Sequence, residues 1–179
     1  AEATRIERFR TNIARVTRPY HSEPTHFHYP GLVEREFHDR EDLTWLEELE
    51  AATDAIAEEF QAVVGAGRAE LGPYIQYSED LPLRQWKSLN QSRDWTAIHL
   101  LQNGHRIEAN ASHCPRTMAA IAAVPQPHIP ERTPNAMFSL LAPGKHIPPH
   151  NGVANTRLVC HLPLIVPEGC WFRVGGGTR

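Results

Sequence analysis

The chain is poor in cysteine and lacks any long apolar run, and each shortage argues against a class of protein. It has three cysteines in 179 residues, an odd number with no CxxC pair. This pattern disfavours a disulfide framework or a zinc knuckle and is typical of the reducing cytoplasm, where we expect the protein to work. No apolar run approaches the roughly eighteen residues of a membrane-spanning helix, and no secretory signal is visible, so we expect no membrane span.

The chain also lacks an excess of positive charge. Its 18 lysines and arginines face 21 aspartates and glutamates, which gives a formal net charge of −3. Because nucleic-acid-binding proteins usually carry a basic patch, we expect no nucleic-acid partner. A chain of this length, with 41% hydrophobic residues, can bury one core, so we expect one main domain.

The first stretch with helical spacing lies at the start of the chain. Its apolar residues recur every three or four positions: Ile6, Phe9, Ile13 and Val16. This spacing predicts a short amphipathic N-terminal helix within residues 1–18 that needs a partner surface. Such a helix could be the end of a helical repeat region, although one helix is not a repeat.

A longer helical pattern follows, after a stretch rich in histidine, proline and aromatic residues. His26 and His28 in that stretch have the i, i+2 spacing of a strand and could bind a metal, but a loop that packs its aromatic side chains on the domain is the interpretation we prefer. From Asp42 to Val64 apolar residues recur opposite an acidic face, which predicts the longest helix of the protein. Pro115 is typical of the first position of a further short helix.

Three stretches are predicted to be strands. Trp95–Leu101 alternates in polarity, and Ala136–Leu141 is a short apolar run that ends before a Pro-Gly turn. Arg157–Val166 also alternates, with leucines and Cys160 on one side and Arg157, Val159 and His161 on the other. An apolar face opposite a face with histidine and arginine is what the wall of a small-molecule pocket in a β-barrel needs.

Polar residues that can bind ligands gather in one segment, FSLLAPGKHIPPHNGVANTRLVCHLPLIVP, residues 138–167. They are Ser139, His146, His150, Arg157 and His161. A plain surface strand with incidental histidines would explain any one of them. Their concentration within thirty residues, between prolines and glycines, favours a functional site.

This segment closely resembles the core motif of the aspartyl/asparaginyl β-hydroxylase family. The resemblance extends upstream through WTAIHLLQNGHRIEANASHCPRT and IPERTPNAMFS, and it covers roughly residues 20–179. It implies an iron(II)- and 2-oxoglutarate-dependent dioxygenase, with O₂ as cosubstrate. It also implies a mainly β fold, a double-stranded β-helix of the jelly-roll or cupin type with helices packed outside. Residues 19–179 would then form the catalytic domain, incomplete at its C-terminal end.

The resemblance assigns a role to five residues. His150 matches a metal ligand of the family, and Ser139 matches the serine that holds the distal carboxylate of 2-oxoglutarate. His161 matches the histidine near the 1-carboxylate, and Trp95 matches a tryptophan that lines the cosubstrate site. Arg157 lies two residues before Val159, where the family often has an arginine, and could substitute for it.

The sequence departs from the family pattern at the metal site. Iron(II) in such enzymes is usually held by two histidines and a carboxylate, the first two ligands forming an H-x-D triplet. Here that triplet is His150-Asn151-Gly152, and Gly152 cannot bind a metal. The resemblance allows this departure, because family members can leave the third position to water. The second histidine and the arginine that binds the distal carboxylate are expected beyond Arg179.

The function we expect is hydroxylation of an aspartyl or asparaginyl side chain in a peptide or protein. Two alternatives stay open at this point. One is a cupin-like binding or scaffold protein without redox activity, and the other is a hydroxylase of a small molecule or lipid on the same scaffold.

We expect residues 1–179 alone to be inactive, because one imidazole and water hold iron(II) weakly when the other ligands are missing. The measurement is succinate formation with iron(II), ascorbate and 2-oxoglutarate, for residues 1–179 and for a C-terminally extended version. Succinate should form only with the extended version. Equal formation by both would show that the ligand set inferred from the resemblance is wrong.

Overall fold

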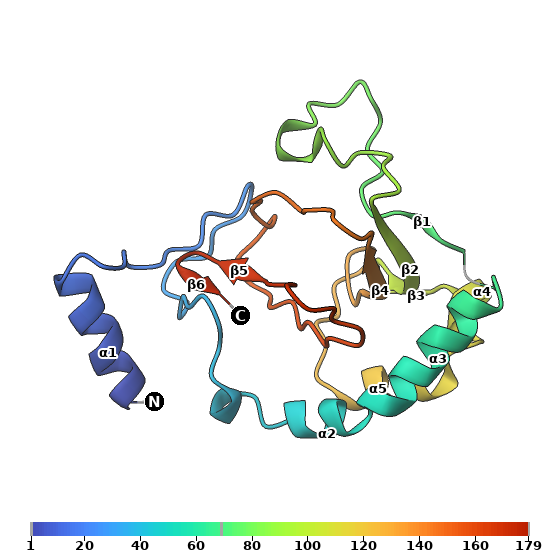
Figure 1. Ribbon diagram of the computed structural model, residues 1–179, viewed down its shortest axis with the longest axis horizontal. Helices are drawn as coiled ribbons and strands as arrows, with labels where there is room; N and C mark the ends of the chain where they lie inside the picture. Colours follow the sequence, from blue (N-terminus) through green and yellow to red (C-terminus); the bar gives the residue numbers. More distant parts are fainter. Residues whose placement is uncertain (1, 69, 179) are drawn as a thin grey trace. The chain divides into compact units, whose positions relative to one another are not determined.

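The computed structural model describes residues 2–68 and 70–178, and the chain divides into two compact units (Figure 1). One unit consists of Trp45–His150 and is called the central unit here. The other consists of Ala1–Thr44 together with Asn151–Arg179 and is called the terminal unit. Among the described residues, none of the helices has both the length and the apolar character needed to cross a lipid bilayer.

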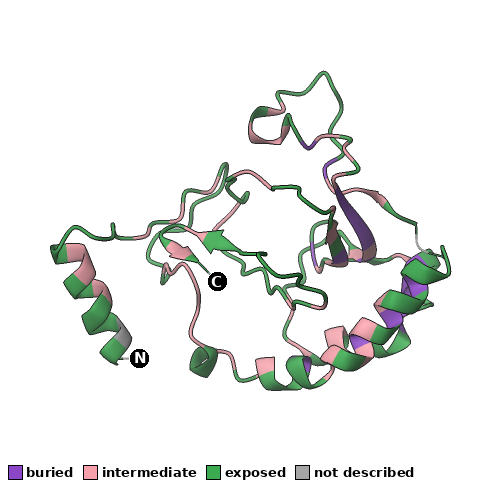
Figure 2. Ribbon diagram, viewed as in Figure 1, coloured by how far each residue is buried: buried purple, intermediate pink, exposed green. Residues whose placement is uncertain are grey.

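The central unit is built on strand β2, Trp95–Gln102, which confirms the strand predicted there. It pairs antiparallel with β4, Ala136–Leu141, the second predicted strand. The short strands β1 (Gly72–Pro73) and β3 (His105–Arg106) also pair antiparallel with β2. Because β4 runs along the length of β2, the two short strands share its other edge. Figure 2 shows β2 as the most buried strand, as a strand paired on both edges should be.

The two faces of this sheet have different neighbours. Ile98, fully buried, lies opposite Phe138 of β4, and the ring of Phe138 packs 5.1 Å from that of Phe60. Helix α3, which carries Phe60, therefore covers this face. Trp95 and Ser139 point to the opposite face, because side chains alternate along a strand. Both faces are buried along β2, but on the face of Trp95 the neighbouring Ser139 of β4 is exposed.

The prediction of one continuous helix over Asp42–Val64 is wrong. The structure has two helices there, α2 (Leu46–Ala51) and α3 (Thr53–Gly65), preceded by a single 3₁₀ turn, Arg40–Asp42. At the break, the hydroxyl of Thr53 donates to the carbonyl of Glu50 at 2.6 Å. A side chain that forms a hydrogen bond with a nearby backbone group competes with the hydrogen bonds of the helix. The spacing of apolar residues does not reveal such competition.

Helix α5, Pro115–Ala123, begins at the predicted proline and is fixed to α3 by one carboxylate. Glu59 of α3 accepts the backbone N–H groups of Arg116 at 2.9 Å and Thr117 at 2.8 Å, and the Thr117 hydroxyl at 2.7 Å. These amides belong to the first turn of α5 and have no partner within the helix. Burial acts to raise the pKa of Glu59, but these hydrogen bonds outweigh it and hold the pKa below its ordinary value. A short helix, α4 (Glu108–Ala111), precedes α5.

The terminal unit begins with helix α1, Glu2–Ile13, which confirms the predicted N-terminal helix. Near its other end, β5 (Arg173–Val174) and β6 (Gly177–Thr178) form a small hairpin. The turn of this hairpin lies against the ring of Tyr20, since a Cβ atom added to Gly175 would come 2.7 Å from that ring.

The strand predicted for Arg157–Val166 is wrong, because the structure assigns no strand to those residues. An alternating sequence forms a strand only when another strand offers it hydrogen bonds, and the sheets described do not include this segment. Antiparallel sheets with flanking helices are present, as predicted. Helical residues outnumber strand residues in the described chain, so "mainly β" overstates its strand content.

The Glu59 carboxylate generates a stability prediction. Glu59→Gln should lower the free energy of unfolding by about 1–3 kcal/mol at neutral pH, because a buried hydrogen-bonded carboxylate loses its charge. Since the folded-state pKa lies below the ordinary value of 4.5, this contribution is present above that pH and is lost as the pH falls. Urea unfolding from pH 7 to pH 3 should therefore show the difference from wild type shrinking.

The matched control is Glu58→Gln on the same helix. Glu58 forms an exposed ion pair with Arg116 at 2.9 Å, which typically contributes less than about 1 kcal/mol. Equal destabilisation by the two substitutions would contradict the specific role given to Glu59.

Candidate functional site

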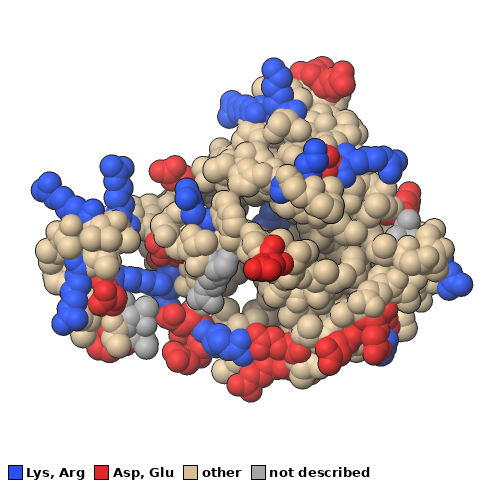
Figure 3. Space-filling view, viewed as in Figure 1, with Lys and Arg blue, Asp and Glu red and all other residues tan. Residues whose placement is uncertain are grey.

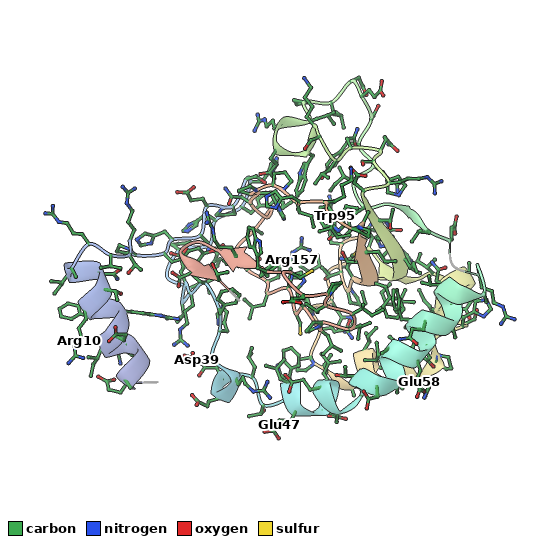
Figure 4. All side chains as sticks on the ribbon, in the orientation of Figure 1. Arg10, Asp39, Glu47, Glu58, Trp95 and Arg157 are labelled. Atoms are coloured by element: carbon green, nitrogen blue, oxygen red, sulfur yellow. The ribbon has the colours of Figure 1, made fainter. Side chains whose placement is uncertain are left out.

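An aromatic cluster marks the site face of the central sheet. Trp95, labelled in Figure 4, lies at the first position of β2 and is 6% exposed. Tyr74 stacks on it with ring centroids 3.8 Å apart and the planes only 7° from parallel. Ile75 and Leu89 complete the buried cluster behind these rings, with Trp86 and Ile147 packed against it. The indole is therefore held in one orientation.

Ser139 faces Trp95 across the strand pair. The indole Nε1–H of Trp95 donates to the Oγ of Ser139 at 2.9 Å. Register places Ser139 opposite Ala97, and Trp95 lies two residues before Ala97, on the same face of the sheet. Because the hydroxyl oxygen accepts this bond, its hydrogen can be donated to a ligand carboxylate. Ser139 is itself exposed, so a ligand can reach it.

His150 lies beside the same rings. Its imidazole centroid is 4.7 Å from that of Trp86 and 6.1 Å from that of Trp95. The Nδ1 atom lies 2.9 Å from the carbonyl oxygen of Pro148. A carbonyl only accepts, so Nδ1 carries the hydrogen, and the neutral ring then keeps its lone pair on Nε2. An imidazole oriented in this way by a backbone carbonyl is the usual form of a histidine that binds a metal.

Arg157 and His161 belong to the terminal unit. The loop before Arg157 is held by two reciprocal hydrogen bonds between Asn155 and the backbone of Tyr29, at 2.8 and 2.9 Å. The ring of His161 packs 4.8 Å from that of Phe172. His161 is exposed, but partial desolvation of its ring still lowers its pKa from the ordinary value. That the two side chains join Ser139 and His150 in one cavity stays a prediction.

The other histidines of the terminal unit have different partners. The carboxylate of Glu34 lies 3.1 Å from the Nδ1 of His21 and 3.6 Å from the Nε2 of His28, and it also accepts the hydroxyl of Ser22. Hydrogen bonds from Ser22 and His21 lower the pKa of Glu34 to about 2. His26 pairs with the adjacent Thr25 hydroxyl at 2.8 Å. The loop interpretation fits these contacts better than a metal site at His26 and His28.

A complete metal site is not formed by residues 2–68 and 70–178, where no group of three or more His, Cys, Asp or Glu is arranged to hold an ion. His150 fits one position of such a site, because its Nδ1 is bonded to Pro148 and its Nε2 lone pair is available. The described residues thus supply a single candidate ligand.

His99 is a further polar residue on the face of Trp95. It follows Trp95 and Ala97 in the alternation of β2 and lies opposite Met137. Within the part of the chain that the structure describes, its buried Nδ1 has no hydrogen-bond partner, and burial lowers the pKa of His99. The alternation of the strand sequence already places His99 on the same face as Trp95. The sequence could therefore have identified His99 as a candidate site residue.

An aromatic wall, a serine hydroxyl and an oriented imidazole lie together beside one face of an antiparallel sheet. Such a combination is typical of a small-ligand site. The model of the aspartyl/asparaginyl beta-hydroxylase family matches residues 50–179. Because that match covers well over half of the chain, the protein belongs to this hydroxylase family. No solved structure matches the chain.

Individual relatives differ in the molecules that their names mention. The chain is 33% identical over 147 residues to an ornithine lipid ester-linked acyl 2-hydroxylase of Rhizobium tropici, which covers 82% of this chain and 48% of that protein. It is 32% identical over 103 residues to the human aspartyl/asparaginyl beta-hydroxylase, covering 57% of this chain and 14% of that one. It is 30% identical over 161 residues to aspartate beta-hydroxylase domain-containing protein 2 of Xenopus tropicalis, covering 89% and 41%. The chain thus spans about half or less of the length of these relatives.

The half-buried imidazole of His99 generates a pH prediction. Its pKa in the folded protein lies below the ordinary value of 6.5, so the unfolded chain binds more protons just below that pH. Stability should therefore fall as the pH is lowered through 6.5, and His99→Leu should remove part of this slope. Urea midpoints at pH 8, 7, 6 and 5.5 measure it. The exposed His113, changed to Leu in the same way, is the control that keeps the wild-type slope; an unchanged slope in His99→Leu would contradict the prediction.

Proposed function

We propose that this chain carries the cosubstrate-binding part of an iron(II)- and 2-oxoglutarate-dependent hydroxylase. The observation that carries the proposal is the arrangement of His150, with Nδ1 bonded to Pro148 and its ring beside the Trp95–Ser139 pair. Family membership supports the reaction class, because the matching family is one of hydroxylases. The double-stranded β-helix belongs to this proposal too, with the antiparallel strands β2 and β4 as part of it.

Each residue has a chemical task in this proposal. His150 would hold the metal through Nε2, and Ser139 would donate its hydroxyl hydrogen to the distal carboxylate of 2-oxoglutarate. Trp95, held flat by Tyr74, excludes water from one side of the cosubstrate and keeps the serine oxygen in place. Arg157 would supply positive charge for a carboxylate, and His161 would supply a hydrogen bond. Iron(II) and 2-oxoglutarate, when bound, supply the oxidising chemistry with O₂.

The substrate we propose first is an aspartyl or asparaginyl side chain of a peptide or protein, hydroxylated at its β-carbon. The similarity to the human aspartyl/asparaginyl beta-hydroxylase supports this choice. A lipid acyl chain is the second candidate, since the similarity to the ornithine lipid hydroxylase extends over 82% of the chain. Peptides and ornithine lipids, offered separately to the extended protein, distinguish the two by the product that gains one oxygen.

Substitution of His150 tests the site. In the C-terminally extended version, His150→Ala should abolish succinate formation from 2-oxoglutarate, whereas His128→Ala, an exposed histidine of a proline-rich loop, should leave it unchanged. Full turnover by His150→Ala would exclude this residue as the ligand. If neither the variants nor the wild type form succinate, a scaffold protein without redox activity is favoured.

A second readout does not depend on turnover. Paramagnetic Mn(II) added to residues 1–179 with 2-oxoglutarate should broaden the NMR signals of the His150 ring before those of His128. Equal broadening of both rings would contradict metal binding at His150.

A further inference from the structure

Helix α1 leaves its apolar side exposed, while the chain that follows it covers part of its polar side. Three large apolar side chains are exposed: Ile6 at 44%, Phe9 at 64% and Ile13 at 66%. Arg8, Thr11 and Asn12, on the other side of the helix, are only half-exposed. The hydroxyl of Thr17 bonds the side chains of both Thr11 and Asn12 at 2.9 Å, so the following chain folds back on the polar side. An amphipathic helix that packs on its own protein has the opposite orientation.

The apolar stripe has positive charge on both borders. At 3.6 residues per turn, Ile6, Phe9 and Ile13 span an arc of about 60°, with Arg5 and Arg10 about 70° to either side of its centre. Each arginine has one exposed glutamate as a partner, Glu2 at 3.3 Å and Glu7 at 4.0 Å. Such exposed pairs are weak and exchange readily. The guanidinium groups can therefore reach a negative surface while the apolar side chains enter it.

The start of the chain carries an excess of basic over acidic residues, unlike the rest of the chain. Residues 2–18 contain five arginines against two glutamates, whereas the remaining residues contain 13 basic and 19 acidic side chains. In Figure 3 several blue side chains project around the α1 segment with red ones among them, red ones gather along α2 and α3, and further blue ones lie on other parts of the surface. The helix itself has three arginines and two glutamates, and Arg15 and Arg18 follow it. This end of an acidic protein is therefore favoured to bind a negatively charged surface.

We propose that α1 is an interfacial helix that docks on an anionic phospholipid bilayer. A bilayer offers both features that the helix requires, phosphate groups for the arginines and an acyl region for Ile6, Phe9 and Ile13. A second copy of this chain fits less well, because two such stripes face to face bring the arginines of both copies together. The proposal concerns binding and does not depend on the hydroxylase reaction.

The experiment is co-sedimentation of residues 1–179 with vesicles of phosphatidylglycerol and, separately, of phosphatidylcholine. Binding to the anionic vesicles should be at least tenfold tighter, since each arginine near such a surface contributes about 1 kcal/mol. High salt should weaken it. No binding, or equal binding to both lipids, overturns the proposal.

Two variants locate the interaction. Ile6→Ala with Phe9→Ala and Ile13→Ala keeps the helix, because alanine is the best helix former, and should reduce binding at least thirtyfold. Arg5→Gln with Arg10→Gln should reduce binding to anionic vesicles roughly 30-fold. The matched control, Arg68→Gln with Arg93→Gln, removes the same charge from exposed sites of the central unit and should bind like wild type. Equal loss in control and variant overturns a specific role of α1.

Self-association is measured on the same samples by analytical ultracentrifugation without vesicles. A monomer at the concentrations used for binding agrees with the proposal. A dimer that the triple alanine variant abolishes, together with no vesicle binding, shows that a second copy covers the stripe and overturns it. Far-ultraviolet circular dichroism of each variant checks that a loss of binding is not a loss of folding.

Discussion

Hydrogen bonding on both edges of β2 is the constraint on which the central unit depends. A strand with β4 along one edge and two short strands along the other has its backbone satisfied in the interior. The side chains on its two faces can then contact different neighbours, because the backbone hydrogen bonds of the strand do not depend on them. Ile98 and its neighbours pack against α3, and Trp95 presents its indole to the other side. The site is thus built on a rigid support, which a ligand site needs in order to hold its groups in register.

The helices are placed by polar contacts as much as by apolar ones. Glu59 joins α3 to the first turn of α5, and its carboxylate replaces the partners that the helix itself cannot supply. The thiol of Cys114, at the start of α5, is fully buried, and burial together with the nearby Glu59 charge raises its pKa. A neutral, inert thiol there is a packing residue. The buried carboxylate next to it is stabilised by its donors and therefore serves structure and not catalysis.

The residues proposed for the site have different structural supports. Trp95, Ser139 and His150 lie together in the central unit, on two paired strands and the proline-rich segment that follows them. Arg157 and His161 lie in the terminal unit, on a segment without regular secondary structure. Trp95 and Ser139 are therefore fixed by the sheet, while the segment that carries Arg157 is held by loop contacts such as those of Asn155.

The sequence by itself determined the strands at β2 and β4, the N-terminal helix and the family, because short periodic patterns and ordered motifs are local properties. It also placed Trp95 on its face of the sheet, since alternation requires no partner. The sequence pattern did not predict the break in the helix after Asp42, because the Thr53 hydroxyl bonds to the backbone of Glu50 at that point. The pattern also could not show that Arg157–Val166 forms no strand, since a strand exists only when another strand pairs with it.

Only the tertiary structure decided which side chains meet. The bond between Trp95 and Ser139 joins residues 44 positions apart, and the role of Glu59 joins α3 to a helix start more than fifty residues later. It also decided that Ile6, Phe9 and Ile13 point outward, where the sequence predicted only an amphipathic helix that needs a partner. Periodicity defines the faces of a helix or strand, but what each face meets depends on contacts between distant segments, and those are set by the packing of the whole chain.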